Sequence, residues 1–159
     1  QWLKDHLNCL ITGHTGVGKT WLACALAHQA CREGYTAAYL RLPRLLHDTA
    51  LARGDGRYPK LLASLAKLDL LVIDDWGMAK LNHDNLRDLL EILEDRYSVR
   101  STIVTSQLPI EKWHDLIGEP TYADAILDRL VHNAYKLKLK GGSMRKKKAT
   151  LTQPDHSQA

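Results

Sequence analysis

The chain has 159 residues and a formal net charge of +4, with 45% hydrophobic and 25% charged residues. This length is about one domain, and the composition is that of a globular protein rather than a disordered or fibrous chain. No apolar run approaches the roughly 20 residues of a membrane helix and no signal peptide is visible, so we expect no membrane association and a cytoplasmic location. Seven basic residues and no acid lie within residues 136–148, and the rest of the chain has a net charge of −3. Such a local basic segment suits an anionic partner such as nucleic acid.

The first half of the sequence alternates short apolar runs with longer segments of helical periodicity. The first apolar run halts at Gly13, as a buried strand would, and Gly34 and Pro43 mark a helix end and a helix start. In chain order we predict a strand at 7–12, a helix at 19–33, a strand at 37–40, helices at 43–54 and 59–66, and a strand at 69–75.

The second half continues the same alternation. Asn82 is a candidate N-cap for a helix with an apolar stripe. Residues 135–140 alternate Lys with Leu or Tyr, which predicts a strand with one solvent-exposed face. Further elements are a strand at 102–105 and helices at 109–117 and 122–132. Buried strands that alternate with helices predict an α/β fold, a five-stranded parallel sheet with helices on both faces.

The three cysteines have no metal-binding spacing. Cys24 and Cys31 are seven residues apart on one predicted helical face, and Cys9 lies in the first strand. We expect buried free thiols rather than a disulfide or a metal site.

A phosphate-binding loop joins the first strand to the first helix. Its residues fit the pattern G-x-x-x-x-G-K-[ST] without a mismatch: Gly13, His14, Thr15, Gly16, Val17, Gly18, Lys19 and Thr20. The glycines let successive backbone N–H groups turn toward phosphates, and the helix N-terminus adds positive potential. Lys19 is predicted to bridge the β- and γ-phosphates of ATP, and the Thr20 hydroxyl to ligate Mg²⁺.

Two consecutive acids end the third strand. Asp74 stands where this fold places its magnesium carboxylate, and Asp75 could orient and polarise the attacking water of a hydrolase. The plainer alternative is that Asp75 only caps the turn into Trp76 and Gly77. The fourth strand delivers Thr105, Ser106 and Gln107 beside these acids, where a polar group can contact the γ-phosphate or the water; ordinary strand-end polarity is again the alternative.

Arg129 lies away from the apolar stripe of its predicted helix. We therefore expect an exposed side chain in a monomer, either solvated, paired with an acid, or inserted into a neighbouring subunit's nucleotide site as an arginine finger.

Together these segments resemble the IstB-like ATPases, helper proteins of insertion-sequence transposition that are related to DnaC-type helicase loaders within the AAA+ class. The P-loop alone is unspecific, but the resemblance runs from it to about residue 148. It rests on residues 13–26 and 42–46, on Asp74-Asp75-Trp76-Gly77, on Thr105-Ser106-Gln107-Leu108-Pro109, and on residues 128–134 and 142–146.

The resemblance implies ATP-dependent assembly of a homo-oligomer on duplex DNA and delivery of that DNA to a transposase in a bacterial cell. It also implies that Arg129 acts in trans and that the Ser106/Gln107 position is the first sensor. Members of the family carry a further N-terminal domain, so we expect this sequence to be a fragment: an AAA+ core over 1–148 without a separate helical lid domain, and a disordered tail over 149–159. The alternative is a helicase-loader-type ATPase that binds a replicative helicase.

The basic residues near the C-terminal end are the candidate DNA contacts. Lys136, Lys138 and Lys140 could equally be lysines that protect an edge strand. The contiguous run of Arg145, Lys146, Lys147 and Lys148 favours contact with duplex phosphates, which carries little base specificity.

Overall fold

The computed structural model describes residues 2–77 and 79–141. Its elements are β1 (Asn8–Thr12), α1 (Lys19–Arg32), β2 (Ala37–Arg41), α2 (Leu42–Asp55), α3 (Tyr58–Lys67), β3 (Leu70–Trp76), α4 (His83–Arg96), β4 (Ser101–Ser106), the 3₁₀ turn η1 (Ile110–Lys112), α5 (Trp113–Ile117), α6 (Pro120–Val131) and β5 (Ala134–Lys138). The predicted alternation of strands and helices is confirmed. The tail predicted at 149–159, the basic run at 145–148 and any lid after Gly141 lie outside the described residues.

The five strands form one parallel sheet in the order β2-β3-β4-β1-β5. The carboxyl ends of all strands therefore meet at one edge of the sheet, where the phosphate loop follows β1 and the two acids end β3. The central strands β1, β3 and β4 are buried almost throughout, as expected for inner strands of a parallel sheet that helices cover on both faces.

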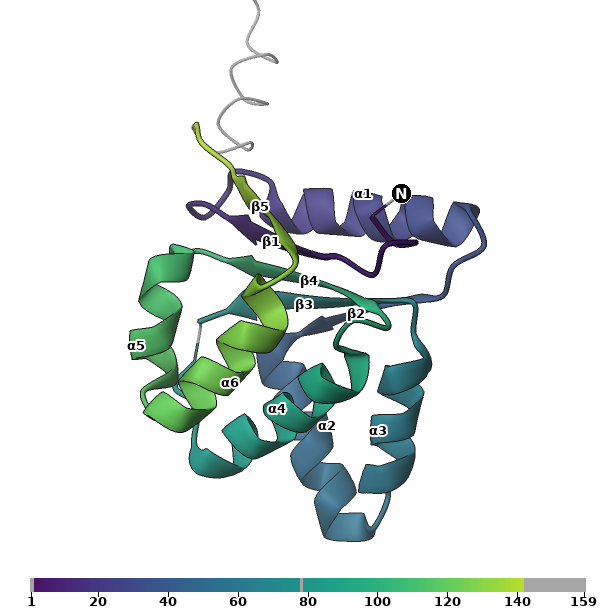
Figure 1. Cartoon of the computed structure of the whole chain (residues 1–159), viewed down its shortest axis with the longest axis vertical. Helices are drawn as coiled ribbons and strands as arrows, with labels where there is room; N and C mark the ends of the chain where they lie inside the picture. The colour runs from purple at the N-terminus through teal and green to yellow at the C-terminus, as the bar shows by residue number, and fades with distance from the viewer. Residues whose placement is uncertain (1, 78, 142–159) are drawn as a thin grey trace, which may run out of the picture.

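Helices cover both faces of this sheet, as predicted. Figure 1 shows α1 on one face, and α2, α4 and α6 on the other. The larger apolar cluster lies between the sheet and the α2–α6 side, and includes Leu45, Leu89 and Ile126. A smaller cluster on the α1 side includes Ile11 and Ala23. No helix among residues 2–77 and 79–141 is long and apolar enough to cross a membrane.

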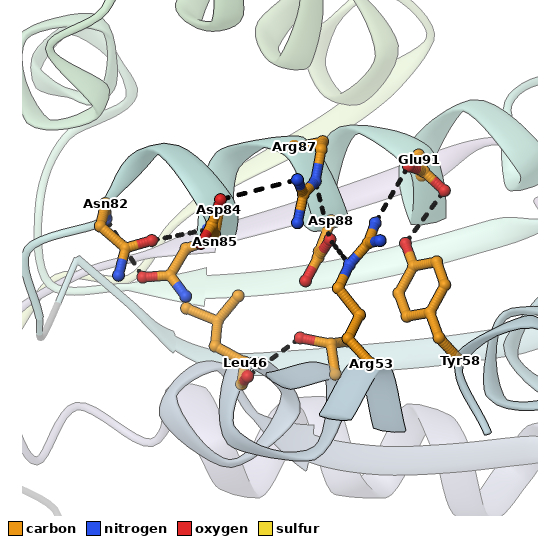
Figure 2. A network of polar contacts seen from close by, with 10 residues as sticks. Leu46, Arg53, Tyr58, Asn82, Asp84, Asn85, Arg87, Asp88 and Glu91 are labelled. Atoms are coloured by element: carbon orange, nitrogen blue, oxygen red, sulfur yellow. Dashed lines mark hydrogen bonds and ion pairs between the residues drawn. The ribbon is translucent and has the colours of Figure 1, made fainter. Parts of the chain in front are cut away.

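A polar network joins three helices on the larger side (Figure 2). Asn82 caps α4 as predicted, accepting from the Asn85 amide at 2.8 Å in a reciprocal capping pair. Arg53 of α2 donates to Asp88 of α4 at 2.6 Å, and its guanidinium lies 3.8 Å from the ring centre of Tyr58 of α3. These contacts fix α2 and α3 against α4, the helix that also packs on α6.

Two expectations about burial are wrong. The edge strand β5 is exposed on both faces, with Tyr135 55% and Leu137 39% exposed, because α1 packs over the inner strands and leaves this edge open. Cys9 is buried in β1, but Cys24 and Cys31 are exposed because they lie on the outer surface of α1.

Candidate nucleotide-binding site

The phosphate loop has a backbone that requires glycine. Gly18 adopts φ 96°, the left-handed region, and is the N-cap of α1; no described side chain caps that helix. A Cβ on Gly13 would lie 2.7 Å from the carbonyl oxygen of Leu139, so the loop fits against the segment after β5 only without a side chain. The first-turn amides of α1 are thus left for a ligand, and a helix N-terminus favours an anionic one.

Lys19 lies over the loop. Its Nζ donates to the carbonyl oxygen of His14 at 2.8 Å. Burial lowers the pKa of Lys19, while the charges of Asp74 and Asp75 oppose that shift. The ammonium group therefore lies against the loop backbone and within the field of the two acids.

Asp74 is almost fully buried, and three hydroxyl groups bind its carboxylate. Thr20 Oγ1 lies 3.0 and 3.2 Å from the two oxygens, the Thr105 hydroxyl donates to Oδ1, and the Tyr39 hydroxyl donates to Oδ2. Burial and the hydrogen bond to Asp74 raise the pKa of Tyr39. The Thr20 hydroxyl and the Asp74 carboxylate are oxygen donors of the kind that Mg²⁺ prefers, so this pair fits the predicted metal.

Asp75 is turned toward the neighbouring edge strand. Its backbone has φ 63°, and the pairing of β3 with β4 shifts register between Ile73 and Trp76. Left-handed backbone is unusual for a residue other than glycine, although Asp tolerates it better than most. In this conformation Asp75 Oδ2 lies 2.5 Å from Arg41 Nε, and the Asp75 amide donates to the Thr105 hydroxyl. Asp75 therefore lies next to Asp74, but its carboxylate is engaged in an ion pair with Arg41.

The predicted sensor residues have different surroundings. Ser106 is buried; its hydroxyl donates to the carbonyl oxygen of Trp76 at 2.6 Å and accepts from the Leu108 amide. That hydroxyl fixes the turn after β3 to the turn after β4. Gln107 is exposed and lines a cavity of about 450 Å³ together with His14 of the phosphate loop. Both residues lie beside the loop, since the Ser106 carbonyl oxygen accepts from the Gly13 amide at 3.2 Å, but of the two side chains only that of Gln107 lines the cavity.

Arg129 is less exposed than the sequence predicts. Its side chain is 29% exposed because α6 packs on α4, so that Arg129 lies along the seam between the two helices. The guanidinium pairs with Asp128 at 2.6 Å and Glu94 at 3.6 Å, and lies 5.2 Å from the ring centre of Tyr97. Arg129 is thus a cation held by acids of its own chain.

Asn8 fixes the end of the helix that carries Arg129. Its Nδ2 donates to the carbonyl oxygens of Arg129 and Leu130, each at 3.2 Å, and its Oδ1 accepts from the Thr102 amide. Asn8 begins β1, whereas the phosphate loop follows Thr12 at the other end of that strand. Four residue steps of about 3.3 Å put roughly 13 Å of strand between them, so Arg129 and the phosphate loop lie at opposite ends of the sheet.

The lysines of the β5 segment are exposed: Lys136 and Lys138 lie on the strand and Lys140 follows it. Lys138 Nζ is 4.0 Å from Glu111 Oε1. These lysines form a basic edge beside the cavity that Gln107 lines.

Sequence reasoning missed four residues of this region: Tyr39, Arg41, Glu94 and Asn8. Each acts through a partner far away in the sequence, and no local motif marks them.

Curated relatives share long stretches of this sequence. A putative insertion sequence ATP-binding protein of Sinorhizobium fredii is 58% identical over 146 residues, which are 92% of this chain and 60% of that protein. The insertion sequence IS21 putative ATP-binding protein of Pseudomonas aeruginosa is 34% identical over 140 residues, 88% of this chain and 53% of that protein. The chain thus spans about 60% or less of these relatives' length.

Solved structures of low sequence identity share the fold. The crystal structure of the DnaC helicase loader aligns with a TM-score of 0.73 at 22% identity, covering 87% of this chain and 81% of that one. AMPPCP-bound DnaA from Aquifex aeolicus aligns with a TM-score of 0.78 at 17% identity, covering 99% of this chain and 50% of that one. The fold is that of the P-loop AAA+ proteins. The family model of the IstB-like ATP binding protein matches residues 1–152, so this chain belongs to that family.

Proposed function

We propose that this chain is the ATP-hydrolysing core of a transposition helper that assembles on duplex DNA and delivers it to a transposase. The observation that carries the ATPase part is one cluster at the carboxyl edge of the sheet. There Thr20 and Asp74 lie within 3.0 Å of each other, beside Asp75 and below the phosphate loop.

The chemistry follows from the placement of these groups. The loop amides after Gly13 and the Lys19 ammonium would hold the phosphates, with Gln107 at the side of the γ-phosphate. Mg²⁺ held by Thr20 and Asp74 would neutralise charge on the β- and γ-phosphates. Asp75 would orient a water and accept its proton as the water oxygen attacks the γ-phosphorus; the bond from that phosphorus to the β–γ bridging oxygen breaks, and ADP leaves with the bridging oxygen. For that step Asp75 has to leave its ion pair with Arg41.

Arg129 would complete the site of a second copy. Its place at the far end of β1 supports use in trans, because its own phosphate loop lies at the opposite end of the sheet. A guanidinium that reaches the γ-phosphate from a neighbour contributes about 10³–10⁵ in rate in other NTPases. Hydrolysis would then depend on subunit contact.

The DNA part is supported by charge and by relatives. Exposed lysines follow the β5 edge, and residues 145–148 extend the basic segment. The curated relatives are insertion sequence ATP-binding proteins, and a structurally similar DnaA is bound to AMPPCP and single-stranded DNA. We therefore propose duplex DNA, a transposase and further copies of this chain as partners, and the bacterial cytoplasm as the location.

The test is ATP hydrolysis by the purified chain, with and without duplex DNA, over a range of protein concentrations. Arg129→Ala is compared with Arg57→Ala, a control arginine whose side chain is 68% exposed and pairs with Asp55 of the same chain. We expect turnover that rises with DNA and with protein concentration, falls at least 100-fold in Arg129→Ala, and is unchanged in Arg57→Ala.

Two results would contradict the proposal in different ways. Turnover that is the same with and without DNA but rises on adding a replicative helicase would point to the helicase-loader alternative. Turnover that depends neither on protein concentration nor on Arg129 would rule out a site shared between copies.

A further inference from the structure

The edge strand β2 supplies a side chain to each of the two consecutive acids. Tyr39 and Arg41 are two residues apart, so both lie on the same face of the strand. The Tyr39 hydroxyl binds Asp74, and the Arg41 guanidinium binds Asp75. Register pairs Tyr39 with Val72 and Arg41 with Asp74, which brings both side chains to the carboxyl end of β3.

The three hydroxyls on Asp74 do not have equivalent roles. The Thr20 hydroxyl contacts both carboxylate oxygens and is itself a candidate metal ligand, so its hydrogen bonds change when a metal binds. The Thr105 hydroxyl holds Oδ1 and also accepts from the Asp75 amide. Tyr39 alone of the described residues remains as a fixed donor to Oδ2.

A buried carboxylate with one oxygen unheld can rotate about its Cβ–Cγ bond. Hydrogen-bonded partners behind a metal ligand fix its orientation, and their loss typically weakens metal binding 10- to 100-fold. Asp74 is only 2% exposed, so solvent cannot replace a missing donor easily. The donor that restrains Oδ2 therefore helps to fix the orientation in which the Asp74 carboxylate can bind a metal.

We propose that Tyr39 is a positioning residue for the magnesium site: its hydroxyl holds Asp74 so that the carboxylate receives the Mg²⁺ that enters with ATP. This role rests on the proposed function, because it requires a magnesium–nucleotide complex at the phosphate loop. Tyr39 is 39% exposed on an edge strand, so its ring contributes less to the core than the inner-strand residues do.

The test uses Tyr39→Phe, which removes only the hydroxyl. Tyr135→Phe is the matched control, because Tyr135 is an exposed tyrosine on the other edge strand. Binding of a fluorescent ATP analogue is titrated with Mg²⁺ and, separately, in EDTA. Mn²⁺ binding to the complex with a non-hydrolysable ATP analogue is followed by electron paramagnetic resonance. Thermal melting checks folding.

We expect Tyr39→Phe to raise the Mg²⁺ and Mn²⁺ concentrations at half-saturation about tenfold. Nucleotide binding in EDTA and all properties of Tyr135→Phe should stay unchanged. A lower melting temperature with unchanged metal titrations would overturn the proposal, since it would make Tyr39 merely structural. If the unaltered protein binds no nucleotide with Mg²⁺, the proposed function fails as well; if it binds normally and Tyr39→Phe matches it, only the positioning role fails.

Discussion

Arg96 is the buried cation on which the α3–α4–β4 junction depends. Its side chain is 2% exposed and donates to three backbone carbonyls and one hydroxyl: Leu65 O and Leu68 O at 2.7 Å, Ser101 O at 2.5 Å and Thr102 Oγ1 at 3.1 Å. Two of these carbonyls lie at the C-terminal end of α3, which has no intrahelical donors for them. One guanidinium on α4 thus satisfies acceptors from two other segments, the end of α3 and the start of β4.

Arg96→Met keeps an unbranched apolar stem and removes all the donors of the guanidinium. Each buried acceptor left without a donor costs about 1–3 kcal/mol. At the lower value for each of the three carbonyls, the free energy of unfolding falls by about 3 kcal/mol. This is a large share of the roughly 5–15 kcal/mol by which a typical protein is stable. For a domain of this size it lowers the melting temperature by roughly 6–12 °C.

The stability of Arg96→Lys should lie between that of the unaltered protein and that of Arg96→Met. An ammonium group has three donors, but it cannot direct them to acceptors as widely separated as a guanidinium can. Burial and the charge of Arg100 lower the pKa of Arg96 to about 10, which still leaves it charged at neutral pH.

Urea unfolding at pH 7 measures these changes. The control is Arg87→Met on the same helix, whose side chain is 41% exposed and pairs with Asp84 and Asp88 at 3.5–3.6 Å; we expect it to cost less than about 0.5 kcal/mol. A loss of less than about 1 kcal/mol in Arg96→Met would refute the reasoning, because the carbonyls would then have found other donors.

Two further predictions concern the thiols and the candidate base. Burial raises the pKa of Cys9 to about 11, so at pH 8 we expect iodoacetamide to modify the exposed Cys24 and Cys31 but not Cys9. Mass spectrometry identifies the modified cysteines, and modification of Cys9 in the folded protein would contradict this prediction. Arg41→Gln removes the positive charge that pairs with Asp75, so ATP turnover without DNA should rise several-fold while nucleotide affinity stays unchanged. A fall in turnover would instead make Arg41 an essential part of the site.

The parts of the site that follow from local sequence could be predicted. The phosphate loop is a contiguous motif between a strand and a helix, so its residues needed no tertiary information. Asp74 could be placed because a parallel sheet brings the carboxyl ends of its strands to one edge, and the pairing of β3 with β4 confirms that Thr105 lies beside it.

The contacts that depend on strand order and helix packing could not be predicted. Tyr39 and Arg41 meet the acids only because β2 is the neighbour of β3, and Asp75 points to Arg41 only because its backbone is left-handed. The exposure of Arg129 was predicted wrongly because a helical stripe says which face is apolar, but not that α4 lies close enough to supply Glu94.

The separation of Arg129 from its own phosphate loop constrains how copies could associate. If Arg129 serves a neighbour, the surface that gives the arginine and the surface that receives it are different, so the contact is head-to-tail. The guanidinium would then exchange the carboxylates of Asp128 and Glu94, which hold it in this structure, for the more highly charged phosphates of a nucleotide. An empty neighbouring site offers no phosphates for such an exchange. Assembly through this arginine would therefore depend on bound ATP, and hydrolysis with phosphate release would favour the return of Arg129 to its own acids.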